Sequence, residues 1–538
     1  MPKLIRYLAV FTFLVPVALM LASPAHAQGM ISAPGDTEDV LNPDLAALQG
    51  VEGQRTVTLQ RLLLRLGYLS DADLSRKMDA TTIAALEKHL DDAKLSRKNL
   101  TYDVVLRSLF STVWTKEDWS SGTVNGQELV IGPAEVRTLQ DTLKKIGYEP
   151  GPADGIFGPA TYTAIEVFQQ DEGLKVSGLP TRNVTQNIER SLAFLGKEPR
   201  ATIRVLNWPD YINPDLLVQF EKETGIKVVH EVFDTSDETK QLLLAKSDQY
   251  DVMVQPGYQM RPILDAGDLI ETLDLAKLPN SSNLDPAALK ITTMLDPGNR
   301  HSVPYFWGTV GIGINETLVK PIRPDLKKSS MASFLDPAIA ADLSKCGLAM
   351  VDEPLDVMSS LVAYTGGDPS NITTSDLEAV EQVITKVAPY IQLVPEENFI
   401  DSLASGKYCV MMGYSGDVFL ARDTAKKSGK GKISYAVPVE GSQLWFDLLV
   451  IPKSAHNTAA AYKFVDFMLR PKVAADNTNF LQYANANLNS KPFIEPALLK
   501  DPGIYPPASV LKRLAILPPL TGNVEAEINR IWDKLRKK

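Results

Sequence analysis

Residues 203–229 read IRVLNWPDYINPDLLVQFEKETGIKVV, and this stretch decides the predicted fold. Its first part, IRVLNW, is an apolar run typical of a strand. The next part predicts a helix, because Asn213 can cap it, Pro214 suits its first position and Gly225 can end it. The apolar run KVVHEVF, from residue 227, then predicts a second strand. The order strand, helix, strand indicates an α/β fold.

The same alternation continues downstream, and it indicates where a ligand would bind. TKQLLLAKS from residue 239 predicts a helix and YDVMVQP from residue 250 a strand, and this pattern continues to the end of the chain, with largely parallel sheets expected. About 340 residues follow Ile203, which is long for one sheet, so we predict two lobes. Ligands of such folds bind at the carboxyl ends of strands, where loops lead into helices.

Aromatic and acidic side chains recur together at these strand ends. The groups occur in NWPDY, GYSGDVF and LWFD, and their members are Trp208, Asp210, Tyr211, Tyr414, Asp417, Trp445 and Asp447. In a strand, residues 445 and 447 point to the same face, and an aspartate buried there needs a partner for its charge. A bound ammonium group would be such a partner, and each aromatic face would add about 1–2 kcal/mol through cation–π attraction. The pattern predicts a pocket for an organic cation.

Three of the aspartates also have ordinary structural explanations. Asp417 follows Gly416 at a predicted helix start and is a candidate N-cap. Asp356, in DEPLDVMSSL, falls in a first helical turn, where a carboxylate suits the helix dipole. Asp210 can form an Asx-turn before the next helix. Both explanations stay open for these three, and Asp447 is the hardest to explain structurally.

Residues typical of catalysis or metal binding are not grouped in the sequence. The histidines of the mature chain are isolated, no GxSxG or P-loop is present, and Gly311 and Gly313 lack the third glycine of GxGxxG. We therefore predict no enzyme, no catalytic residue, no metal and no cofactor. The formal net charge of −10 argues against a nucleic-acid partner, which requires a basic surface.

The N-terminus has the features of an export signal. Lys3 and Arg6 precede an apolar run that is interrupted by Pro16 and followed by Ala-His-Ala at 25–27. We predict cleavage after Ala27 and a soluble periplasmic protein; a membrane anchor is the alternative.

Export also bears on the two cysteines, Cys346 and Cys409. An oxidising compartment favours a disulfide over two buried thiols. Closing so long a loop would stabilise the fold by about 4 kcal/mol on the chain-entropy model.

Two repeats precede the α/β region. In residues 136–181, VRTLQDTLKKIGY predicts a helix, ADGIFGPAT is turn chemistry, and Pro159 opens a second helix. The pattern LQ–GY–DGxFGxxT–A–FQ–GL–G resembles the peptidoglycan-binding repeat of cell-wall enzymes, a small three-helix module. A fainter copy, LQRLLLRLGYLSDADLSRKMDATTIAALEKHL, begins at Leu59 and lacks the DGxFG turn. This departure implies packing rather than glycan contact for the first copy.

These observations divide the chain into five parts. They are a signal peptide at 1–27, a degenerate peptidoglycan-binding-like repeat with flanks at 28–125, a peptidoglycan-binding-like domain at 130–192, a linker at 193–202 and a two-lobe domain at 203–538.

The two-lobe region resembles the periplasmic polyamine-binding proteins of ABC importers, most of all the putrescine-binding type. The resemblance runs from Ile203 to Lys538 and rests on NWPDYINPD, FEKETGIKVV, PYFWGTVGIGIN, KCG, YCVMMGYSGDVF, LWFD, YANAN and PGIYPP in this order. It implies a type II periplasmic-binding-protein fold, in which the two lobes close over the ligand by hinge motion. It also implies crossings between the lobes near 305–315 and 440–452, and a family disulfide between the two cysteines.

Matched residue by residue, the resemblance implies a ligand site with aromatic walls and acidic ends. Its members are Trp208, Asp210, Tyr211, Asp356, Tyr414, Asp417, Trp445, Asp447 and Tyr483.

The sequence departs from the family at this site. Pro209 and Pro256 stand where the putrescine type has serines, so two hydroxyl contacts near one amine are lost. Tyr414 stands for a tryptophan, Trp445 for a phenylalanine and Asp356 for a glutamate. These changes leave the particular amine, and the retention of binding, open.

Two functions of different classes follow. The first is a solute-binding protein that captures a polyamine-like cation for an ABC permease or a membrane sensor, with peptidoglycan as a second partner through the repeats. The alternative is a cell-wall-associated scaffolding or signalling protein with a degenerate site. A peptidoglycan hydrolase, suggested by the repeats, fails because no catalytic constellation is present.

Overall fold

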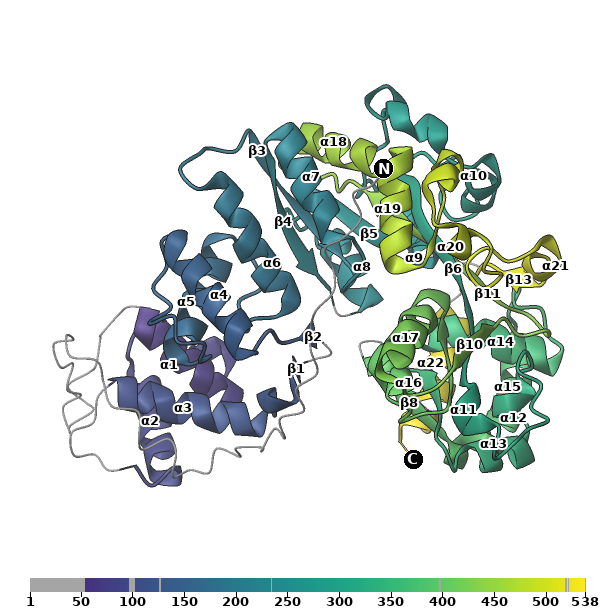
Figure 1. The fold of residues 1–538 in the computed structure, drawn as a ribbon, viewed down its shortest axis with the longest axis horizontal. Coiled ribbons are helices and arrows are strands. Elements are labelled where there is room, and N and C mark those ends of the chain that lie inside the picture. Colours follow the sequence, from purple (N-terminus) through teal and green to yellow (C-terminus); the bar gives the residue numbers. More distant parts are fainter. Residues whose placement is uncertain are drawn as a thin grey trace, which may run out of the picture.

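The computed structural model describes residues 54–95, 102–124, 127–233, 235–395, 398–517, 520 and 522–537 (Figure 1). The predicted signal peptide, its cleavage site after Ala27 and the flank up to residue 53 lie outside the described residues. Within them, no helix has the length and apolar character needed to span a membrane.

The N-terminal region, residues 54–195, is helical and has one shared core. Its elements are α1 (Gln54–Leu66), α2 (Ala80–Asp92), α3 (Tyr102–Lys116), β1 (Thr123–Val124), β2 (Gln127–Glu128), α4 (Pro133–Lys145), α5 (Pro159–Asp171) and α6 (Arg182–Ser191). Apolar residues of both repeats pack into a single cluster around the buried Trp119. We call this region the N-terminal module.

The two repeats have the same internal hydrogen bond. Gln60 donates from Nε2 to Oγ1 of Thr82 (2.8 Å), and Gln140 donates from Nε2 to Oγ1 of Thr161 (3.1 Å). These glutamines and threonines occupy equivalent positions in the two repeats. The first repeat therefore keeps the helix-to-helix bond of the second, although it lacks the DGxFG turn.

The first lobe comprises residues 201–307 and 444–516 and packs around one main core, with a smaller apolar cluster formed by residues between 475 and 504 and Phe419. Its strands are β3 (Ala201–Asn207), β4 (Ile226–Val232), β5 (Val252–Pro256), β12 (Ala484–Asn485) and β13 (Leu514–Ala515). Its helices are α7 (Pro214–Thr224), α8 (Ser236–Leu244), α9 (Gly257–Ala266), α10 (Pro286–Thr292), α18 (Thr458–Met468), α19 (Pro471–Leu481), α20 (Pro496–Leu499) and α21 (Ala508–Leu511).

The second lobe comprises residues 308–443 and 517–537 and has a core of its own. Its strands are β7 (Leu348–Val351), β8 (Ile391–Val394), β9 (Val410–Tyr414) and β10 (Ile433–Ala436). Its helices are α11 (Glu316–Val319), α12 (Ala332–Leu335), α13 (Pro337–Leu343), α14 (Pro354–Thr365), α15 (Thr374–Val387), α16 (Phe399–Ala404), α17 (Ser415–Ser428) and α22 (Gly522–Arg536).

Two long strands, β6 (Ser302–Asn315) and β11 (Ser442–Val450), join the lobes. The sheet order β4-β3-β5-β11-β6-β9-β7-β8 places both at its centre. They pair antiparallel with each other and with β5 or β9, whereas β3–β5 and β7–β9 form parallel groups. The antiparallel centre departs from the largely parallel expectation, because two adjacent strands that run between the same lobes in opposite directions must pair antiparallel. The two-lobe α/β fold predicted from the sequence is confirmed.

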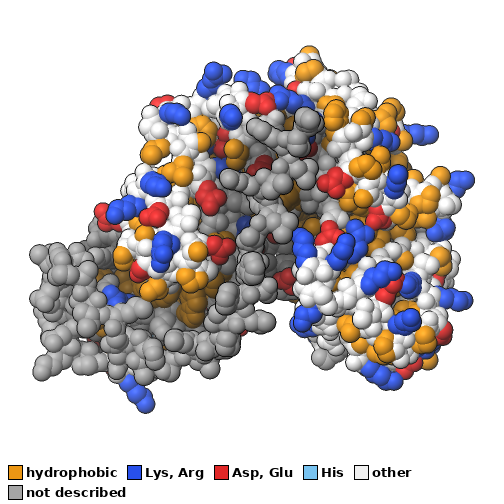
Figure 2. All heavy atoms as spheres, in the orientation of Figure 1, with side chains coloured by type: hydrophobic (Ala, Val, Ile, Leu, Met, Phe, Trp, Pro, Cys, Tyr) orange, Lys and Arg blue, Asp and Glu red, His pale blue; other side chains and the backbone are white. Residues whose placement is uncertain are grey.

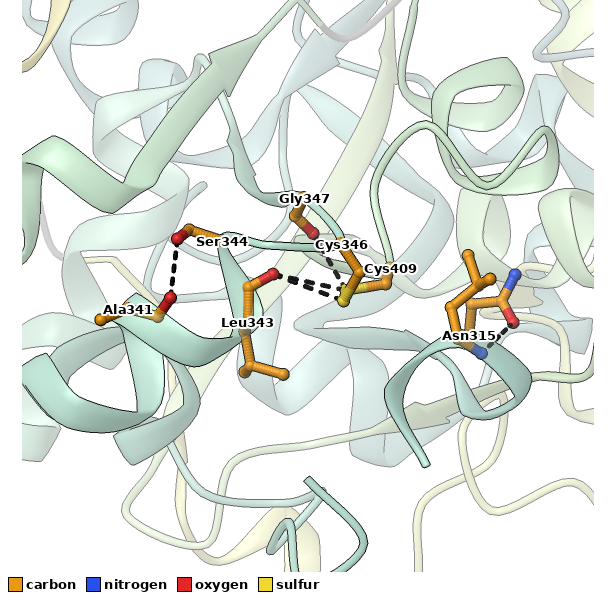
Figure 3. The surroundings of a disulfide bond; sticks show 8 residues. Asn315, Ala341, Leu343, Ser344, Cys346, Gly347 and Cys409 are labelled. Atoms are coloured by element: carbon orange, nitrogen blue, oxygen red, sulfur yellow. Dashed lines mark hydrogen bonds between the residues drawn. A yellow bond between two sulfur atoms is a disulfide. The ribbon is translucent and has the colours of Figure 1, made fainter. Parts of the chain in front are cut away.

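The predicted disulfide is present in the second lobe (Figure 3). Cys346 follows α13 and Cys409 precedes β9, and their Cα atoms are 5.5 Å apart. The bond ties the end of a surface helix to a buried strand of the sheet.

Candidate functional site

A cleft of about 540 Å³ lies between the two lobes and contains every ligand residue predicted from the sequence. Its walls come from the loop after β3, the starts of α14 and α17, the strands β9 and β11, and the segment after α19. The predicted residues that line it are Trp208, Asp210, Tyr211, Asp356, Tyr414, Asp417, Trp445, Asp447 and Tyr483. They are spread over 276 positions of the sequence, and the meeting of the lobes brings them together.

The loop after β3 forms the first-lobe wall. The ring of Trp208 packs against Phe233, with centroids 4.2 Å apart, so its other face is available to the cleft. Asp210 is exposed to the cleft and has a left-handed backbone, with φ of +50°. Asn213, not Asp210, caps α7, since its side chain accepts a hydrogen bond from the Asp215 amide at 3.1 Å. Asp210 is therefore free of the capping role.

Asp356 lies in the first turn of α14 and is buried at the second-lobe wall. Its carboxylate accepts hydrogen bonds from the Tyr414 hydroxyl (2.6 Å) and from Nε2 of Gln443 (2.8 Å). Burial raises the pKa of Asp356, and these two donors oppose the rise because they stabilise the charged form. The position of Asp356 in the first turn therefore agrees with the helix-dipole explanation, and the residue also lines the cleft.

Asp417 lies in the first turn of α17, but the residue at the N-cap position is Tyr414. The Asp417 carboxylate instead accepts a hydrogen bond from the Tyr483 hydroxyl at 2.8 Å. Burial raises its pKa to about 7, and the nearby charge of Asp210 adds to this rise. The N-cap explanation is wrong, because the side chain reaches across the cleft floor to another element.

Asp447 lies at the centre of β11, opposite Pro256 of β5 and Phe306 of β6. Burial raises the pKa of Asp447 to about 7. Tyr211 lies close to Asp447 and favours the charged form of the Asp447 carboxyl group. The buried Tyr211 hydroxyl nevertheless makes no hydrogen bond to a described residue. Asp447 is thus a buried acid without a compensating cation among the described residues.

Aromatic rings surround these acids. Trp445 meets Tyr414 and Tyr483 edge to face, with centroids 6.1 and 5.2 Å apart. Tyr211 packs edge to face on Tyr483 at 5.6 Å. The indole Nε1 of Trp445 is buried without a hydrogen-bond partner among the described residues. The rings present π faces and edges around acidic oxygens, which suits a cation with an apolar body.

The cleft has further polar lining that sequence reasoning missed. Glu353 is the N-cap residue of α14, and burial with its neighbours Asp356 and Asp352 raises its pKa to about 8. Arg536 of α22 reaches the rim and pairs with Asp352 at 2.9 Å. The sequence DEP at 352–354 could have indicated Glu353, because Glu353 precedes Asp356 by about one helical turn. Nothing local marked Arg536.

Three of the cleft acids have no basic partner in the described part of the chain. Neither an ion pair nor a nearby positive charge accompanies Asp356, Asp417 or Asp447 there. No cluster of histidine, cysteine and acidic side chains with metal-binding geometry occurs among the residues described. The arrangement can accommodate an organic cation whose ammonium groups neutralise buried carboxylates.

Two protein-family models match the chain. Residues 215–506 match the model described as bacterial extracellular solute-binding protein, and residues 132–187 match the putative peptidoglycan binding domain. The N-terminal helical module thus includes a peptidoglycan-binding domain.

Individual relatives agree with the family match. The chain is 36% identical over 336 residues to the putrescine-binding periplasmic protein SpuD of Pseudomonas aeruginosa, covering 62% of this chain and 91% of that one. It is 36% identical over 349 residues to the putrescine-binding periplasmic protein PotF of Escherichia coli, covering 64% and 94%.

A solved structure has the same two-lobe fold. It is a putative spermidine/putrescine ABC transporter protein from Listeria monocytogenes, with a TM-score of 0.56 and 28% identity. The match covers 62% of this chain and 98% of that one.

Proposed function

The chain belongs to the bacterial extracellular solute-binding protein family, and from this premise we propose that it captures an aliphatic diamine of the putrescine class between its lobes. The observation that carries the proposal is a set of three cleft carboxylates, Asp356 and Asp447 buried and Asp417 half-buried, which lack a basic partner among the described residues and stand beside aromatic rings. The names of the relatives support the same ligand class.

A diamine suits this cleft because it has one ammonium at each end and an apolar chain between them. Acids come from the first-lobe loop, the second lobe and the hinge strand β11, so both ends can find a carboxylate when the lobes close. Closure excludes water and strengthens each charge pair. The side chains of Pro209 and Pro256 line the cleft without a hydroxyl, which alters the polar contacts around one amine. The proposal therefore names the class of amine.

We further propose that the protein works in the periplasm after cleavage at Ala27 and delivers its ligand to an ABC permease. The relatives SpuD and PotF are periplasmic, which supports the compartment. The peptidoglycan-binding domain would hold the protein at the cell wall. Sedimentation of the full chain with purified peptidoglycan tests this; a protein that stays in the supernatant contradicts it.

Calorimetry with putrescine, cadaverine, agmatine and spermidine tests the ligand class. We expect Asp447→Ala to weaken diamine binding about 100-fold, because a lost charge-assisted contact costs about 2–3 kcal/mol. Trp208→Ala removes a cation–π face and should weaken binding about tenfold or more. Asp268→Ala is the matched control, since the Asp268 side chain is 77% exposed on the first lobe.

Two outcomes would contradict the proposal. One is unchanged affinity in both cleft variants. The other is a wild-type protein whose melting temperature no diamine or polyamine raises, since any tight ligand stabilises the folded state. The second outcome favours the scaffolding function with a degenerate cleft.

A further inference from the structure

The N-terminal module packs directly against β4, the edge strand of the first lobe. Figure 1 shows α6 lying beside this strand. Asn187 of α6 donates from Nδ2 to the His230 carbonyl (2.7 Å) and accepts from the His230 amide (3.1 Å). One side chain thus satisfies both backbone groups of an edge-strand residue, as a neighbouring strand would.

Charged contacts flank this central bond. Lys227 of β4 pairs with Glu172 of the module at 2.7 Å, and Arg190 of α6 pairs with Glu221 of α7 at 3.7 Å with both side chains buried. The His230 ring between them is buried, and burial lowers its pKa to about 3, so it is neutral. A buried interface with paired charges fixes the module on the first lobe, although a linker was predicted at 193–202.

The contacts also define the direction of α6. Asn183, near its start, donates to the His230 carbonyl at 3.1 Å, whereas Arg190, near its end, donates to the earlier Val228 carbonyl at 3.5 Å. The helix therefore runs antiparallel to β4, and its N-terminus faces the carboxyl ends of β4 and of its parallel neighbour β3. The loop with Asp210 follows β3 at this same carboxyl end of the strands.

Arg182 is the first residue of α6 and lies at the carboxyl ends of β3 and β4. Its guanidinium donates to the Glu128 carboxylate of β2, with Nε at 2.8 Å from Oε2. The side chains of Arg182 and Glu128 are 50% and 55% exposed. The side chain of Asp210 is open to the cleft, but the surrounding protein still raises its pKa. The positive charge of Arg182 lowers the pKa of Asp210, and the negative charge of Glu128 raises it. Both charges of the pair thus act on a cleft carboxylate.

We propose that Arg182 and Glu128 of the N-terminal module change the affinity of the cleft for a dication in opposite directions, each through its own charge at the cleft end of β3 that carries Asp210. This inference rests on the proposed diamine function. Arg182 repels an ammonium at Asp210 and Glu128 attracts it, so the intact pair is nearly neutral to the ligand. The module then contributes charges next to the ligand site, although none of its described residues lines the cleft.

Opposite effects of two single variants test the pair in the full chain. Arg182→Gln should tighten putrescine binding and Glu128→Gln should weaken it, each roughly two- to fivefold at about 0.01 M salt, with the double variant close to wild type. Both effects should nearly vanish at about 1 M salt, where the Debye length is about 3 Å. Lys144→Gln is the matched control, because Lys144 is exposed on α4 of the same module.

A second measurement does not depend on any ligand. The pKa of Asp210, followed by carboxyl carbon NMR, should rise in Arg182→Gln and fall in Glu128→Gln. Shifts in the same direction, or no shift in either variant, would overturn the proposal even if putrescine binds. If the pKa values move as expected while wild type binds no amine, the charge pair stands and the diamine function fails.

Discussion

Asp417 and Asp447 reach the cleft from a helix and a strand, and the enclosing protein raises the pKa of both carboxyl groups to about 7. Burial therefore favours the protonated form of both groups when the cleft is empty. An ammonium beside either group stabilises the carboxylate and lowers its pKa, so binding must expel protons. Ligand binding and protonation compete at the same oxygens.

This competition predicts that diamine affinity falls as pH drops from about 8 to about 5. The amine stays charged over this range, so the loss comes from protonation of the cleft acids with pKa about 7. Calorimetry in buffers of different ionisation enthalpy should show proton release on binding near pH 7. Affinity that does not vary with pH would contradict charged carboxylates as the ligand contacts.

The unliganded protein should show the opposite trend in stability. The ordinary pKa of each group is 3.8 and its pKa in the fold is about 7, so the folded state binds more protons between these values. Stability therefore rises as pH falls from about 7 towards about 4, as far as these two groups contribute. Urea titrations of wild type and of Asp447→Asn at several pH values test this, since the variant should lose part of the slope.

At the scale of elements, the disulfide stabilises the second lobe without touching the cleft. Its cysteines are separated by 63 positions, so the double variant Cys346→Ser/Cys409→Ser should lose about 4 kcal/mol of unfolding free energy on the chain-entropy model. Diamine affinity at low temperature should be unchanged, because neither cysteine lines the cleft. Denaturant titration with calorimetry checks both. Loss of binding in a variant that still folds would contradict this separation.

The contact of α6 with β4 gives another prediction at the same scale. Asn187→Ala leaves the amide and carbonyl of His230 buried without these partners, so the free energy of unfolding should fall by about 1–3 kcal/mol. Gln219→Ala on the exposed face of α7 is the control and should change stability little. Equal stability of the two variants would mean that the module is not held by this bond.

At the scale of the whole molecule, β6 and β11 pass between the lobes, β11 lines the cleft, and the return of the chain to α22 makes a third connection. Small-angle scattering should show a smaller radius of gyration with putrescine, because the lobes close. The Asp447→Ala variant should show no change. Charged side chains of both signs are interspersed on the visible face of the described residues (Figure 2).

Sequence reasoning succeeded where the relevant contacts are local. The helix from Pro214 to Thr224 follows from its cap and its final glycine, and both function as predicted. It left two explanations open for Asp417, because a carboxylate in the first turn of a helix is chemically the same whether it caps the helix or accepts a bond from a distant tyrosine. It also missed the antiparallel centre of the sheet, since strand direction depends on how the lobes are connected.

The sequence by itself determined the helices and strands, the two repeats, the cysteine pair and the chemical kinds of residue at the strand ends. Only the tertiary structure decided that the Tyr414–Asp356 and Tyr483–Asp417 contacts form across 58 and 66 positions, and that Asn187 meets β4 across 43. Capping and periodicity depend on neighbours within a few residues. The cleft and the module interface instead depend on how the complete sheet and its helices pack, so no short stretch contains them.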